Sequence, residues 1–127
     1  MTEITNDELI AKAKSVVKAR KINHGCSVGD NGCALLTDKN NVYLGVSIDV
    51  SSGMGFCAEH SAIASMITAG EHKIKKIVAI SRGKIRPPCG RCREFMHQMH
   101  EDNLKADVLL GKKKSVKLKE LLPFLWD

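Results

Sequence analysis

The first helical pattern of the chain lies close to its start. Apolar residues recur there every three or four positions, at Leu9, Ile10, Ala13, Val16 and Val17. This spacing places them on one face of a helix. Thr5 followed by Glu8 forms a capping box, which marks the helix start. The pattern therefore predicts a helix that runs to about Arg20, followed by a polar, turn-rich loop over 23–32.

Later apolar runs are short, and turn residues separate them. They predict strands over 33–37, 42–50, 74–81 and 106–110, and the segment 38–41 joins the first two as a hairpin turn. Helical spacing resumes from Ala58 to Gly70 and again from Cys89, and a short helix over 118–122 closes the chain before Pro123. Strands that alternate with helices predict βαβ crossovers and a sheet covered by helices.

Composition then limits the class of protein. The 127 residues are 43% hydrophobic and 27% charged, which is typical of one globular domain over 1–127. No apolar run approaches the roughly 20 residues that a membrane span needs. The acidic start lacks the basic and apolar segments of a secretory signal. We therefore expect a cytoplasmic protein whose five cysteines stay reduced.

The net charge of +6 favours an anionic partner, and nucleic acid is one candidate. However, the lysines are spread along the chain, and the dense cluster at 112–114 lies in an expected turn. Aromatic residues make up only 4% of the chain, which disfavours a base-stacking surface for single strands. A small-molecule partner is the preferred hypothesis.

Two cysteine segments carry the chemistry. Cys57 precedes one predicted helix, and Cys89 and Cys92 form a Cys-x-x-Cys pair at the start of another. Helix starts favour thiolates, and such a pair supplies two sulfurs to one zinc ion. Structural zinc normally takes four protein ligands, whereas catalytic zinc takes three and keeps one position for water. With Cys57 as the third ligand, the sequence predicts one catalytic Zn²⁺ per subunit.

Glu59 is the predicted proton carrier. It lies two residues after Cys57, within reach of a water at the metal. Attack of water on an aromatic amidine carbon needs a group that moves protons to the ring nitrogen and to the departing ammonia, and a carboxylate suits that task. A lone Cys-x-x-Cys is more typical of a structural zinc site or a redox pair. The combination of both segments in this order favours a deaminase.

On these motifs the sequence resembles the cytidine deaminase family, including its blasticidin S deaminase branch. The anchors are Cys57 to Glu59, Pro88 to Arg93, and Glu120 to Pro123. The resemblance implies a three-layer α/β/α fold with a mixed five-stranded sheet covered by helices. It also implies a homotetramer whose subunits share active sites. A cysteine at position 57 is typical of the branch that acts on free nucleosides.

The resemblance also implies substrate contacts. Ser47 and Asp49 stand where the family binds the ribose with Asn-x-Glu. The backbone N–H of Ala58 would bind the ring carbonyl, and the Pro88 carbonyl would accept from the amino group. The closing aromatic that stacks on a neighbour's base is Trp126, with Phe124 as the alternative.

Three further residues are implied near the metal. His60 occupies the place of an arginine that offsets the charge of three thiolates in the family. Arg93, Arg91 or a protonated His60 would take over that task.

The predicted function is hydrolysis of the C–N bond of a cyclic amidine, which converts cytidine or deoxycytidine to its uridine counterpart and ammonia, in salvage or in detoxification. Three alternatives stay open. A modified cytosine nucleoside such as blasticidin S is one. A nucleic-acid-binding or editing zinc protein is the second, because of the net charge, and a non-catalytic zinc scaffold is the third, because of the altered substrate contacts.

Overall fold

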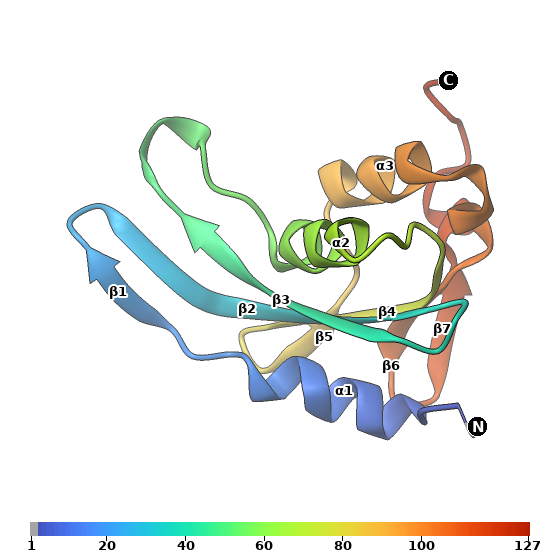
Figure 1. Cartoon of the computed structure of the whole chain (residues 1–127), viewed down its shortest axis with the longest axis horizontal. Coiled ribbons are helices and arrows are strands. Elements are labelled where there is room, and N and C mark those ends of the chain that lie inside the picture. Colours follow the sequence, from blue (N-terminus) through green and yellow to red (C-terminus); the bar gives the residue numbers. More distant parts are fainter. Residues whose placement is uncertain (1–2) are drawn as a thin grey trace.

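The computed structural model describes residues 3–127 and has three layers. Helix α1 (Asn6–Ser15) covers one face of a central sheet, and helices α2 (Ala58–Thr68) and α3 (Gly90–Met99) cover the other (Figure 1). The predicted α/β/α layering is confirmed. Every helix within 3–127 is too short or too polar to cross a lipid bilayer.

The sheet is mixed. Its strands are β1 (Arg20–Asn23), β2 (Cys26–Thr37), β3 (Val42–Asp49), β4 (Ile74–Ser81), β5 (Lys84–Arg86), β6 (Asp107–Gly111) and β7 (Lys114–Lys117). Strands β4 and β6 pair in parallel, and the other pairs are antiparallel. The segment between β4 and β6 contains α3, so the predicted βαβ crossover is confirmed.

The described residues form seven strands, so the expected count of five was wrong. Strands β1, β5 and β7 have three or four residues each and are almost wholly exposed. Because neither face of such a strand is buried, its sequence shows no apolar alternation. The lysine cluster at 112–114 lies in the tight β6–β7 connection and the first residue of β7.

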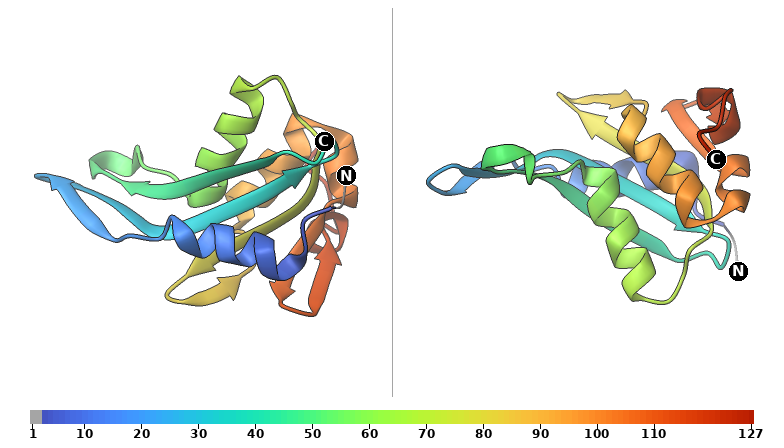
Figure 2. Two further views of the ribbon diagram at one scale, coloured as in Figure 1. Left: turned by 60° about the horizontal axis from the view of Figure 1, so that its bottom comes forward. Right: turned by 90° about the horizontal axis from the view of Figure 1, so that it is seen from above.

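The opening helix ends at Ser15, five residues before the predicted end. The chain leaves the helix because the Lys18 N–H donates to the Gly29 carbonyl at 3.0 Å, which draws this segment onto β2. Gly29 has a φ of +79°, and a Cβ there would overlap the Lys18 carbonyl. The predicted loop over 23–32 was also wrong. The segment 23–32 contains the end of β1, the turn of the β1–β2 hairpin and the first residues of β2, which begins at Cys26 rather than at residue 33 (Figure 2).

Three short 3₁₀ helices complete the fold: η1 (Ser51–Gly53), η2 (Glu101–Lys105) and η3 (Leu118–Leu121). The predicted closing helix is therefore a single 3₁₀ turn. The predicted hairpin turn over 38–41 is confirmed, with Asn40 at a φ of +65°.

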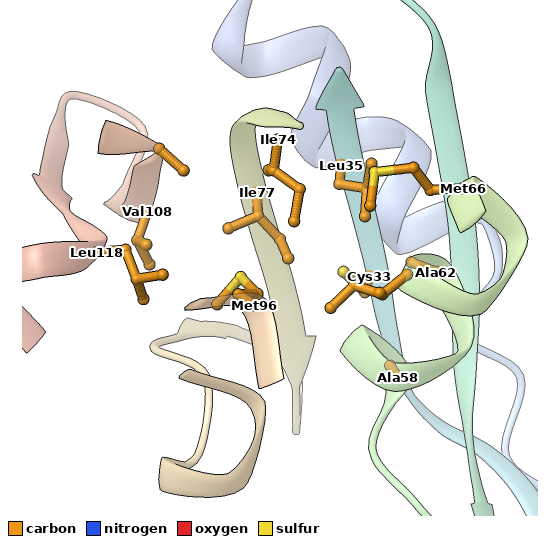
Figure 3. Packing of buried hydrophobic residues seen from close by; sticks show 12 residues of the cluster. Cys33, Leu35, Ala58, Ala62, Met66, Ile74, Ile77, Met96, Val108 and Leu118 are labelled. Carbon is orange, nitrogen blue, oxygen red and sulfur yellow. The ribbon is translucent and has the colours of Figure 1, made fainter. Parts of the chain in front are cut away.

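Strand β2 carries buried side chains on both of its faces. Cys33 and Leu35 point towards α2, whereas Ala34 and Leu36 pack with α1 on the opposite face. Figure 3 shows the first set, in which Ala62 and Met66 of α2 face β2. The expectation that Cys33 faces the core is confirmed, since its side chain is fully buried. This core holds α2 at a fixed height above the sheet.

Candidate active site and metal centre

The start of α2 is fixed by strand β3. Ile48 and Phe56 exchange two backbone hydrogen bonds of 3.0 and 2.9 Å, which hold the segment just before Cys57. The Ser61 hydroxyl donates to the Val46 carbonyl at 2.6 Å. Gly45 allows the closest approach, because a Cβ there would overlap backbone atoms of α2. Cys57 is the N-cap of α2, and these contacts hold the start of that helix in place.

The start of α3 is fixed by Arg93. Its Nε donates to the Pro88 carbonyl at 2.7 Å, and its Nη1 donates to the Leu121 carbonyl at 3.5 Å. One side chain thus ties the segment before the helix to η3. Cys89 is the N-cap of α3 and Cys92 lies in its first turn, where it is fully buried. Figure 2 shows the N-terminal ends of α2 and α3 on the same side of the molecule.

The three sulfurs meet between these two helix starts. The Sγ atoms of Cys57 and Cys89 are 3.5 Å apart, and those of Cys57, Cys89 and Cys92 all lie within 4.8 Å of one another. Four ligands at about 2.3 Å from a tetrahedral zinc ion are separated by about 3.8 Å. The trio therefore has the spacing of zinc ligands. Within residues 3–127 it is the one group of this kind.

Among residues 3–127 no disulfide uses these sulfurs. All five cysteines carry free thiols, and the Cys57 side chain makes no capping hydrogen bond to α2. Burial raises the pKa of Cys57 and of Cys92, and the neighbouring acidic groups raise both further. Burial raises the pKa of Cys89 as well. Hydrogen bonds from the backbone of α3 and from the neighbouring thiols outweigh this effect and bring its pKa below the ordinary value. A divalent cation relieves the repulsion among three such thiolates.

Glu59 lies in the first turn of α2 and is only 6% exposed. It lines a pocket of about 170 Å³ together with Cys57 and Cys89. Burial raises the pKa of its carboxyl, partly offset by a hydrogen bond from its own backbone N–H. The pocket thus joins two of the three sulfurs to a carboxyl that keeps its proton to a higher pH than an exposed one does.

Residues 5–106 match the model of the cytidine and deoxycytidylate deaminase zinc-binding region. The chain belongs to the cytidine deaminase family. Cytidine deaminase from Halalkalibacterium halodurans is 31% identical over 96 residues, which cover 72% of this chain and 73% of that protein. Cytidine deaminase from Mycoplasma genitalium is 41% identical over 73 residues, which cover 52% of this chain and 55% of that protein.

The fold of this deaminase-family chain agrees with solved structures. Cytidine deaminase from Burkholderia pseudomallei has a TM-score of 0.75 and 28% identity, covering 97% of this chain and all of that one. Cytidine deaminase from Mycobacterium tuberculosis has a TM-score of 0.80 at 21% identity, covering 98% of this chain and 99% of that one. In sequence alignment, however, the chain spans about half the length of the first curated relatives that it matches, 55% and 46%.

The zinc prediction fits both findings. The matched family region is described as zinc-binding, and Cys57, Cys89 and Cys92 of this deaminase-family chain have the donor chemistry and the spacing for one Zn²⁺. Three sulfur donors leave a fourth position, which is typical of a catalytic site.

Several predicted substrate residues lie elsewhere. The Ser47 hydroxyl is buried and accepts a hydrogen bond from the Asn31 N–H at 3.0 Å, so it links β3 to β2. Asp49 is exposed at the end of β3, and neither residue lines the pocket. Trp126 and Phe124 are 80% and 92% exposed and are also absent from its walls.

The two predicted backbone contacts lie close to the metal ligands. Ala58 is the first residue of α2, where a helix leaves its N–H groups unpaired. Pro88 directly precedes Cys89, and its carbonyl accepts the bond from Arg93. Pro87 and Cys89, on either side of Pro88, both line the pocket.

The residues predicted to surround the metal take different places. His60 stacks on Phe95 with ring centroids 3.9 Å apart, and its Nδ1 is buried without a partner among the described residues. Burial, and then the charge of Arg91, lower the pKa of His60 and favour the neutral ring. Arg93 donates to the Pro88 carbonyl next to Cys89, and Arg91 is exposed on the first turn of α3.

Sequence reasoning missed three polar residues of the pocket wall, which are Asn31, Ser81 and Arg86. Asn31 faces Ser81 across β2 and β4. It reaches the pocket through a bulge, because β2 uses four residue steps from Val28 to Gly32 where β3 uses two. The only available signal for Asn31 was the unusual polar stretch at 30–31. Arg86 was visible only as part of a basic loop.

Proposed function

We propose that this chain catalyses the zinc-dependent hydrolytic deamination of a cytosine nucleoside, to the uracil nucleoside and ammonia, as one domain over 1–127. The observation that carries the proposal is the shared pocket of Glu59 with Cys57 and Cys89, with Cys92 completing the sulfur trio. The relatives named cytidine deaminases support the same reaction. Neither nucleic-acid binding without catalysis nor a silent scaffold accounts for a buried carboxyl beside three thiols. The relatives are named as cytidine deaminases, which favours a nucleoside substrate over nucleic-acid editing.

The metal and the protein divide the chemistry. Zinc, when held by Cys57, Cys89 and Cys92, supplies Lewis acidity that makes water a nucleophile at neutral pH. The Glu59 carboxylate takes a proton from the attacking water and gives it to the ring nitrogen. A second proton then passes through the same carboxylate to the amino group, which leaves as ammonia. The balance is one water added at the amino-bearing carbon and one ammonia released.

Backbone groups at the two helix starts orient the base. The Ala58 N–H, on the first turn of α2, donates to the ring carbonyl. The Pro88 carbonyl accepts from the amino group with the lone pair that Arg93 leaves free. The pocket wall includes Cys57, Pro87 and Cys89, which are chain neighbours of these two groups.

A homotetramer supplies the rest of the site in this proposal. The pocket lacks an aromatic wall among the described residues, whereas Trp126 and Phe124 project into solvent. A tail that reaches a neighbouring subunit would place an aromatic ring on the neighbour's base. The cytoplasm is the proposed location, because its reducing conditions keep all five thiols free for metal binding. Salvage of pyrimidine nucleosides is the proposed role.

The direct test is a Glu59→Gln variant loaded with zinc and assayed for ammonia release from cytidine. Glutamine has the size of glutamate but carries no proton between water and substrate. We expect kcat to fall by about 10³-fold or more while the zinc content stays at one per chain. The matched control is Glu101→Gln, an exposed residue of η2 outside the pocket, which should keep full activity. Undiminished turnover in Glu59→Gln would remove Glu59 from the mechanism.

A further inference from the structure

Two consecutive prolines precede the cysteine pair, and they limit the backbone support of this segment. Pro87 and Pro88 have no N–H groups, so neither can donate to a neighbouring strand or helix. Strand β5 ends at Arg86 and α3 begins at Gly90, so the prolines belong to neither element. Pro88 is nevertheless buried. Its carbonyl therefore needs a donor from elsewhere in the chain to hold it in one orientation.

Arg93 is that donor. Its Nε donates to the Pro88 carbonyl at 2.7 Å, a short hydrogen bond of the kind that a charged donor forms. Within residues 3–127 no backbone N–H bonds to this carbonyl, so the orientation of the carbonyl depends on one side chain. Because the guanidinium is planar and rigid, its position is fixed by whatever its other nitrogens contact.

The other end of the guanidinium contacts the closing turn of the chain. The Nη1 of Arg93 donates to the Leu121 carbonyl of η3 at 3.5 Å. This turn is itself fixed, because the Leu118 N–H donates to the Ala106 carbonyl at 3.0 Å and the Leu118 side chain is fully buried. Arg93 therefore holds the Pro88 carbonyl against a part of the core that lies far from it in the sequence.

The guanidinium is directed at carbonyls rather than at carboxylates. None of the ion pairs within residues 3–127 includes an arginine. The first turn of α3 contains no acidic residue, and the start of a helix disfavours a nearby positive charge. The two carbonyl bonds are thus the hydrogen bonds that place Arg93 here, and their geometry can be separated from its charge by substitution.

We propose that Arg93 is a positioning residue, which holds the Pro88 carbonyl so that it distinguishes an amino group from an oxo group at the reacting carbon. The inference rests on the proposed deamination, in which this carbonyl accepts a hydrogen bond from the amino group. The reaction replaces the amino group, a donor, by an oxo group, which only accepts. A fixed carbonyl therefore attracts the substrate and repels the product, whereas a carbonyl that can rotate away does neither.

The test measures the binding of cytidine and uridine to the zinc-loaded protein by calorimetry. All variants carry Glu59→Gln, so that cytidine is not consumed. With Arg93 present, cytidine should bind about tenfold more tightly than uridine. Arg93→Gln should weaken cytidine binding and strengthen uridine binding, which reduces the ratio of the two affinities about tenfold. A general loosening of the site would weaken both ligands alike and leave the ratio unchanged.

The same change is measurable in the chain that retains Glu59. There, Arg93→Gln should raise the KM for cytidine and lower the inhibition constant of uridine, the product. Opposite shifts for substrate and product are the signature of a misplaced carbonyl.

Arg93→Lys separates position from charge, and it carries the test alone if Arg93→Gln does not fold. Lysine keeps the positive charge, but its single nitrogen cannot bond to both carbonyls, so the ratio should stay below that of the chain with arginine. Arg20→Gln is the matched control. Arg20 also donates to a carbonyl, that of Lys18 at 3.0 Å, but it lies on the exposed strand β1 outside the pocket, and the ratio should not change. Zinc content and circular dichroism check each variant.

The outcomes separate this inference from the function on which it rests. If wild type releases ammonia from cytidine, a ratio that Arg93→Gln leaves unchanged, or that Arg93→Lys restores in full, overturns the inference and leaves the proposed function standing. A chain that distinguishes cytidine from uridine through Arg93 but releases no ammonia overturns the proposed function alone. A chain that binds neither nucleoside and releases no ammonia overturns both.

Discussion

Asn103 offers the sharpest test of how the fold holds α3. Its side chain is fully buried, and its three hydrogen bonds reach three separate segments of the chain. The Oδ1 accepts the Ile74 N–H at 2.8 Å, and the Nδ2 donates to the carbonyls of Met96 and His72 at 2.9 and 3.1 Å. It therefore links the end of α3 and the loop after α2 to the first residue of β4.

The perturbation is Asn103→Ala, which leaves one buried N–H and two carbonyls without these partners. At about 1 kcal/mol for each lost hydrogen bond, we expect the free energy of unfolding to fall by about 3 kcal/mol. Urea unfolding of wild type and variant at the same zinc concentration measures this difference. Asn23→Ala is the control, since Asn23 is exposed on β1 and should change stability by less than about 0.5 kcal/mol. A loss below about 1 kcal/mol for Asn103→Ala would refute the argument.

Three further outcomes are expected. Gly45→Ala inserts a methyl group into the contact with α2 and should cost about 1–3 kcal/mol by urea unfolding; an unchanged stability would show that α2 is not seated there. Asn31→Ala should raise KM about tenfold with little change in kcat, and a selective loss of kcat would contradict a binding role. Burial alone raises the pKa of Glu71, but hydrogen bonds from Tyr43 and Asn41 bring it below its ordinary value, so wild type should be more stable than Glu71→Gln at pH 7. That advantage should disappear in acid-unfolding measurements as the pH falls from the ordinary glutamate pKa through the lower pKa of the folded state, and an advantage that persists would contradict it.

The parts of the fold that bury side chains were predictable from sequence. Helices α2 and α3 begin where the apolar spacing placed them, and Cys33 faces the core because β2 alternates between two buried faces. The three sulfurs are close because both helices start at the same side of the sheet. The cysteine motifs lie at helix starts, and the position of a helix start depends on nearby residues, so a sequence pattern can indicate it.

The parts that depend on long-range register were not predictable. Asn31 enters the pocket only because β2 has two more residues than β3 across the bulge, and this difference appears only after both strands are paired. The same pairing directs the Ser47 hydroxyl to the Asn31 N–H. Strand β1 was missed because all four of its residues are exposed. Trp126 was assigned from a resemblance, and its contact would lie on another subunit.

X-ray absorption spectroscopy at the zinc edge of the purified chain tests the central claim most directly. One zinc per chain, with three sulfur neighbours at about 2.3 Å and one lighter neighbour from solvent, is the expected spectrum. A chain without zinc, or a zinc ion whose fourth neighbour is a protein side chain, would contradict a hydrolytic centre at Cys57, Cys89 and Cys92.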